Sequence, residues 1–97
     1  MFPISYFDCE YVDGYYQTVE PEIADSILTD GINTIMTELG YYKTLDKSKR
    51  NTNAQEIQIN IATLGKIVSL FQKNERTELF NTYFNIYQEN AAWYESL

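Results

Sequence analysis

The sequence predicts a mostly helical α+β protein, in which an N-terminal β-hairpin over residues 4–19 is followed by three amphipathic helices. Apolar residues recur every three or four positions over residues 54–73, which is typical of one face of a helix. Residues 4–19 are rich in Tyr, Phe and Val, which favour strands. With 97 residues and 44% hydrophobic content, the chain is long enough for a single domain with one core. The alternative is an all-helical protein with an extended N-terminal arm.

The hairpin prediction depends on the dipeptide Asp13-Gly14, which lies between Val12 and Tyr15. Asp-Gly is a common two-residue turn between antiparallel strands. Two strands alone are marginally stable in water. We therefore expect the hairpin either to pack against the helices or to extend the sheet of a partner. An extended, tyrosine-rich arm over the same residues remains the second interpretation.

The first helix is predicted over residues 21–39. Pro21 suits the first helical position, and Glu22 favours the positive end of the helix dipole. Gly40 is the expected stop. The side chains predicted to be buried along one face are Ala24, Leu28, Ile32, Ile35 and Leu39.

Residues 41–52 show neither helical nor alternating periodicity and predict an exposed basic loop. The bases of this segment are Lys43, Lys47, Lys49 and Arg50. Such a loop is longer than most connections between helices, which makes it a candidate for function. A solvated loop without a dedicated partner is the simpler interpretation.

The second helix is predicted over residues 54–73 and is expected to be the centre of the fold. Asn53 would cap its first turn, with Glu56 reaching back to the cap, and Asn74 would supply a left-handed stop. The side chains expected to face the core are Ile57, Ile61, Leu64, Val68 and Phe71.

The third helix is predicted over residues 75–94. Its apolar side chains cover about half of the helical circumference, more than the stripe of about 100° that packing on one neighbour requires. They are Leu79, Phe80, Tyr83, Phe84, Ile86, Tyr87, Ala91, Trp93 and Tyr94. Either the N-terminal hairpin or a partner protein must cover the excess.

The composition disfavours most catalytic and metal chemistry. The chain has no histidine and one cysteine, Cys9, so zinc sites and Ser-His or Cys-His catalysis cannot be built from it. Its four glycines match no phosphate-binding loop, and its acids lack the spacing of a calcium loop. Paired carboxylates such as Asp8 and Glu10 are better interpreted as a solvated face. We expect no catalytic residue, no metal and no cofactor.

Charge is distributed unevenly along the chain. Its net charge is −7, and residues 1–40 contain eight acids and no base. Direct nucleic-acid binding is therefore disfavoured, since affinity for phosphates requires clustered Lys and Arg.

No apolar run reaches the roughly 18 residues of a membrane span. Nothing indicates an oxidising compartment, so we expect the cytoplasm of a cell or of a virus's host cell.

These features favour a non-catalytic, acidic protein-binding module that docks on a basic, nucleic-acid-binding surface of a partner protein, as an inhibitor encoded by a virus or mobile element would. Acidic residues would speed the encounter, and tyrosines would hold the complex. The expected contact residues are Asp8, Glu10, Asp13 and Glu20, with Tyr11, Tyr15 and Tyr16 as anchors. The alternative is a structural or adaptor subunit of a homo-oligomer or larger assembly such as a virion, using Tyr87, Trp93 and Tyr94.

The small size, the acidity and the lack of catalytic groups are similar in kind to virus-encoded inhibitors, immunity proteins and virion accessory subunits. This resemblance is one of class and covers no motif.

Overall fold

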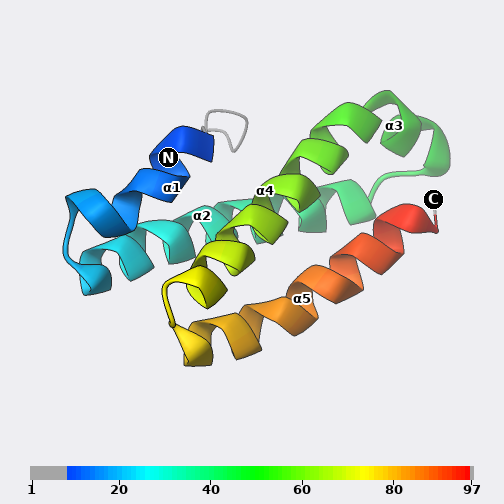
Figure 1. Cartoon of the computed structure of the whole chain (residues 1–97). Helices are drawn as coiled ribbons and strands as arrows, with labels where there is room; N and C mark the ends of the chain where they lie inside the picture. The colour runs from blue at the N-terminus through cyan, green and yellow to red at the C-terminus, as the bar shows by residue number, and fades with distance from the viewer. Residues whose placement is uncertain (1–8, 97) are drawn as a thin grey trace.

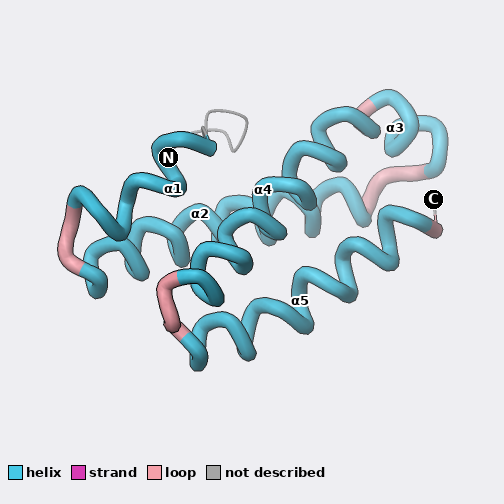
Figure 2. The backbone as a smooth tube through the Cα atoms, in the orientation of Figure 1, coloured by secondary structure: helices cyan, strands magenta, loops and turns pink. Residues whose placement is uncertain are grey.

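The computed structural model describes residues 9–96, and this part of the chain is helical nearly throughout (Figure 1). Within it there are no strands, as the secondary-structure colouring of Figure 2 shows. The helices are α1 (Cys9–Thr18), α2 (Pro21–Lys43), α3 (Lys47–Thr52), α4 (Ala54–Lys73) and α5 (Thr77–Glu95). The protein is therefore predominantly all-helical rather than α+β.

The predicted N-terminal β-hairpin or extended arm is wrong, because residues 9–18 form helix α1. Val12, Tyr15 and Tyr16 follow one another at spacings of three and one, which places them on the same side of a helix. Val12 is buried, and both tyrosines pack against the core. Gly14 is accommodated within the helix without a positive φ. Residues 4–8 of the predicted element lie outside the described residues.

Helix α2 continues one turn beyond its predicted end. Gly40 is helical and does not stop it. The helix ends at Thr44, whose backbone N–H donates to the carbonyl of Tyr41 at 3.0 Å. The predicted loop over residues 41–52 is therefore mostly helical as well. Asp46 begins α3 by accepting a hydrogen bond from the backbone N–H of Lys49 at 2.9 Å, a capping contact that compensates an unpaired donor.

Helix α4 occupies the predicted range and is the centre of the fold, since it packs against each of the other helices. Its predicted caps are wrong. The Asn53 side chain donates to the carbonyl of Lys49 at 2.8 Å and so closes α3 instead of opening α4. Asn74 has a φ of −98°, and the left-handed residue is Glu75, with a φ of 61°.

Helices α2 and α4 run in opposite directions, and α1 and α5 lie on either side of α4 (Figure 1). The molecule is elongated, with extents of 43 × 24 × 17 Å. The core lies between α1, α2 and α4. Its buried apolar residues are Val12, Ala24, Leu28, Ile32, Ile35, Leu39, Ile57, Ile61, Leu64, Ile67, Val68, Leu70 and Phe71.

Candidate protein-binding surfaces

An open groove lies between α4 and α5. Its volume is about 260 Å³. This is below the range of about 300–1,000 Å³ that small-molecule sites occupy. The residues that line it are Ala62, Gly65, Lys66, Val68, Ser69, Gln72, Phe80, Phe84 and Tyr87.

The α5 side of the groove is aromatic, because α5 leaves its aromatic side chains only partly covered. Asn90 is the one fully buried residue of α5. The apolar side chains of α5, from Leu79 to Tyr94, pack against the core but keep some exposure to solvent. Phe80 and Phe84 stack on each other at a centroid distance of 5.1 Å on the α5 side of the groove. Aromatic surface of this kind is favoured at the centres of protein interfaces.

Gly65 lets α5 approach α4 closely. A Cβ atom at this position would lie 2.9 Å from Cε1 of Tyr87, closer than such atoms normally approach. The absence of a side chain therefore leaves room for the Tyr87 ring against the α4 backbone. One turn and a half further along α4, Phe71 meets Tyr83 at a centroid distance of 6.0 Å. These two contacts set the register of the α4–α5 pair.

A polar contact joins the end of α2 to the end of α5. Lys43 Nζ donates to Asn90 Oδ1 at 2.7 Å and lies 5.3 Å from the centroid of the Trp93 ring. Asn90 Nδ2 donates to the Ile86 carbonyl at 2.8 Å, so both ends of this buried amide are paired. Lys43, predicted as part of the basic loop, is instead held against α5.

A second polar cluster joins α1 and α2 to the turn before α5. Asp25 accepts hydrogen bonds from the hydroxyl of Tyr16 and from the guanidinium of Arg76, whose Nε lies 3.1 Å from both carboxylate oxygens. Burial, followed by the hydrogen bond to Asp25, raises the pKa of the Tyr16 hydroxyl well above its usual value. The hydrogen bond to Asp25 likewise raises the pKa of Arg76. The Asp25 carboxylate is therefore used by contacts within the chain.

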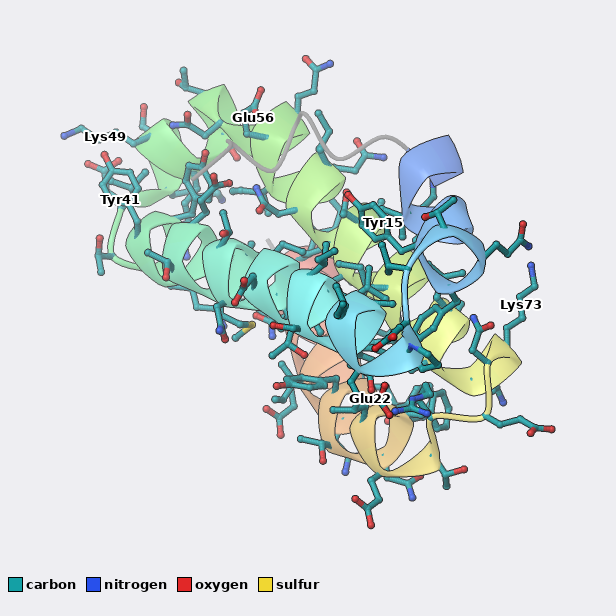
Figure 3. The ribbon with its side chains drawn as sticks, turned by 90° about the vertical axis from the view of Figure 1, so that its left-hand side faces the viewer. Tyr15, Glu22, Tyr41, Lys49, Glu56 and Lys73 are labelled. Atoms are coloured by element: carbon teal, nitrogen blue, oxygen red, sulfur yellow. The ribbon has the colours of Figure 1, made fainter. Side chains whose placement is uncertain are left out.

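The acidic surface follows the exposed side of α2. Glu20, Glu22 and Asp30 are exposed, whereas Asp25 is used internally. Ile23, beside Glu22 at the start of α2, is 49% exposed. In Figure 3, Glu22 lies at one end of α2, while Tyr41 and Lys49 lie together at the other end. The basic helix α3 is thus far from these carboxylates.

The predicted contact residues fall into two groups that the fold does not bring together. Tyr15 and Tyr16 lie on α1 and are half-buried against the core, and Glu20 is exposed just before α2. Asp8 lies outside the described residues. The backbone of Glu10, Tyr11 and Asp13 belongs to α1, but their side chains are not among those described.

The second group, on α5, lies on the other side of α4 (Figure 1). Tyr87, Trp93 and Tyr94 are half-buried and pack against the core. Tyr87 lines the groove, and Trp93 contacts Lys43. Gly65, Phe80 and Phe84 were not predicted as a group. The spacing of four between the two phenylalanines, at the edge of the apolar arc of α5, is the pattern that could have identified them.

Nowhere among the described side chains do three or more acidic or cysteine side chains converge as metal ligands would. No helix within residues 9–96 combines the length and apolarity that crossing a membrane requires. Comparison of the chain with protein-family models, with curated proteins and with solved structures finds no match.

Proposed function

We propose that this chain is a non-catalytic protein-binding module whose acidic α2 surface docks on a basic surface of another protein. The observation that carries the proposal is the exposed Ile23 among the carboxylates of Glu20, Glu22 and Asp30. Ile23 and Asp30 are seven residues apart and therefore lie on the same side of α2. An apolar contact surrounded by charge is the usual arrangement of a protein-binding surface.

The charges would act mainly on the rate of encounter. The first 40 residues contain no base, so the field on this side of the molecule attracts a positively charged partner. Tyr16 cannot serve as an anchor without breaking its hydrogen bond to Asp25. In this proposal the affinity therefore comes from Ile23 and the exposed carboxylates, and an association rate that falls with added salt is expected. The location that we propose for this module is the cytoplasm.

The test compares two charge reversals of equal size. Glu22→Lys with Asp30→Lys reverses the proposed surface, and Glu56→Lys with Glu95→Lys reverses exposed acids on α4 and α5. Glu22 and Glu56 both lie in the first turn of a helix, so the helix-dipole cost is similar. Wild type and both double variants are immobilised on a resin and incubated with native lysate. The proteins that each resin retains are quantified by mass spectrometry.

We expect a basic protein that wild type and the α4–α5 variant retain and the α2 variant loses. Its association rate, measured by surface plasmon resonance, should fall with salt for wild type and much less for the α2 variant. Equal retention by both variants, or equal loss from both, would contradict the proposal, because the position of the charges would then not matter.

The alternative of a structural or adaptor subunit is favoured by one observation, the partly exposed aromatic surface of α5 with Tyr87, Trp93 and Tyr94. Such a subunit would remain bound to its assembly during purification. Trp93→Ala would release it, whereas the α2 double variant would stay bound.

A further inference from the structure

We propose that the chain forms a domain-swapped dimer, in which helix α5 of each copy packs against α4 of the other. In this dimer the turn between the two helices, residues 74–76, opens and α4 continues into α5 as one long helix. Exchange of an identical element keeps the contacts of the monomer, so it forms a dimer at low cost. This inference goes beyond the proposed function and does not use the α2 surface, so either one can fail without the other.

The turn between α4 and α5 holds one residue in an unfavourable backbone conformation. Glu75 has a φ of 61°, where a side chain with a Cβ atom is disfavoured. The turn is also short, since three residues separate the end of α4 at Lys73 from the start of α5 at Thr77. Short connections under strain favour domain swapping, because the strain disappears when the connection opens.

The sequence around the turn favours a helix. Neither proline nor glycine occurs after Gly65, so no strong helix breaker lies between α4 and the end of α5. The residues in and beside the turn with high helix propensity are Gln72, Lys73, Glu75, Arg76 and Glu78. The packing of α5 on α4, rather than the local sequence, is therefore what closes the turn. The α4 surface of a second copy would supply the same packing without the turn.

A continuous helix would turn the packing faces of α4 and α5 to the same side. Each residue that lines the groove from α5 follows, by 18 residues, one that lines it from α4. The pairs are Ala62 with Phe80, Lys66 with Phe84, and Ser69 with Tyr87. Since 18 residues make five helical turns of about 3.6 residues each, both members of a pair would lie on the same side of the long helix. Gly65 and Tyr83, each in contact with the opposite helix, are also 18 residues apart.

Two such helices, each spanning residues 54–95, would meet at their opened turns on a two-fold axis perpendicular to them. Each α5 then lies on α4 of the other copy in the antiparallel direction that it has in the monomer (Figure 1). Gly65 still contacts Tyr87, which now comes from the other copy. The contact between Asp25 and Arg76 opposes the exchange, because it holds the last residue of the turn against α2. We therefore expect the dimer at high protein concentration, where association offsets the loss of this contact.

The test uses two substitutions of Glu75 that remove the same carboxylate and differ in backbone preference. Glycine relieves the left-handed strain and disfavours a continuous helix at both turns of the dimer, so Glu75→Gly should raise the dissociation constant about 100-fold. Alanine keeps the Cβ atom and is the best helix former, so Glu75→Ala should lower the dissociation constant a few-fold. Each chain is unfolded in urea and refolded at millimolar concentration, and the dimer is quantified by sedimentation equilibrium.

An NMR measurement distinguishes the swapped dimer from any other dimer. Equal amounts of isotope-labelled and unlabelled wild-type chains are refolded together, and NOEs between labelled and unlabelled chains are selected by isotope filtering. The contact of Gly65 with the Tyr87 ring should give such an intermolecular NOE, because in the swapped dimer it joins two chains.

A wild-type chain that stays monomeric after refolding at millimolar concentration would overturn the inference. So would a dimer in which the NOE between Gly65 and Tyr87 is only intramolecular, or equal dimerisation of Glu75→Gly and Glu75→Ala.

Discussion

Two buried asparagines differ in how well their amide groups are satisfied. Asn60 on α4 is fully buried. Its Nδ2 donates to the Glu56 carbonyl at 2.9 Å, but its Oδ1 has no hydrogen-bond partner among the described residues. Asn90 on α5 is equally inaccessible, yet Lys43 donates to its Oδ1 and the Ile86 carbonyl accepts from its Nδ2. A buried acceptor without a partner costs about 1–3 kcal/mol, whereas a paired one contributes to stability.

The same substitution should therefore have opposite effects at the two positions. Asn60→Leu removes the unpaired oxygen and keeps the volume, and it should raise the free energy of unfolding by about 1–2 kcal/mol. Asn90→Leu removes the partner of Lys43 and should lower the free energy of unfolding by about 1–3 kcal/mol. Urea unfolding, followed by the fluorescence of Trp93, measures both. A loss of stability in Asn60→Leu as large as that in Asn90→Leu would show that the Asn60 amide is satisfied in solution.

Helix α4 ends in a left-handed turn in which the residue with a positive φ is not a glycine. The Arg76 N–H donates to the Phe71 carbonyl at 2.8 Å and the Glu75 N–H to the Gln72 carbonyl at 3.2 Å, which together form a Schellman motif. Glu75 occupies the position with a φ of 61°. A side chain with a Cβ atom costs about 1–2 kcal/mol in this conformation, and glycine avoids the cost.

Glu75→Gly should therefore raise the free energy of unfolding by about 1 kcal/mol. Glu78→Gly, three residues further on and inside α5, should lower it by up to about 1 kcal/mol, because glycine is unfavourable within a helix. Both variants remove one exposed carboxylate, and Glu78→Gly also removes a favourable interaction with the helix dipole, because Glu78 lies in the first turn of α5. Thermal and urea unfolding of the two variants measure both changes. If both destabilise the protein, the turn does not hold Glu75 in a left-handed conformation in solution.

At the scale of the helices, apolar periodicity predicted the long central helices correctly. The local turn residues led to a wrong prediction at the N-terminal element. The range of α4 follows from the recurrence of Ile57, Ile61, Leu64 and Val68, because only a helix places these side chains together. In α1, Val12, Tyr15 and Tyr16 also lie on one side of a helix, but Asp13-Gly14 and the β-favouring residues predict a hairpin. Packing on α2 and α4 overrides that local preference. The start of α3 also had a local signal in the sequence, because aspartate, here Asp46, is favoured at the N-terminal cap of a helix.

Contacts between distant residues could not be predicted in this way. Arg76 lies 51 residues from Asp25, and Lys43 lies 47 residues from Asn90. Each pair becomes close only through the crossing of α2 and α4 and the return of α5. The apolar excess of the third helix is visible in the sequence. Which of those side chains would border a groove depends on the register that Gly65 and Tyr87 set.

Among the three long helices α2, α4 and α5, the one with the fewest buried side chains is α5. None of its apolar side chains is fully buried, whereas α2 buries five and α4 buries seven. Its ends are connected to α2 by two polar contacts, Asp25 with Arg76 before the helix and Lys43 with Asn90 near its end. Segments with few buried apolar contacts open at a lower free energy than the core around which they pack. The stability of α5 should therefore depend on these polar contacts more than that of α4 does.

Native-state hydrogen exchange should show this difference at a concentration where the chain is monomeric. We expect amides in the middle of α5 to exchange through an opening of lower free energy than those in the middle of α4. Lys43→Ala should lower the opening free energy of α5 by about 1 kcal/mol, because it removes the donor to Asn90 and the cation above Trp93, and should leave α4 unchanged. Lys47→Ala on α3 is the control, and should change neither. Equal protection of α4 and α5 in wild type would mean that all the helices unfold as one unit, and that the partial exposure of α5 has no effect on its local stability.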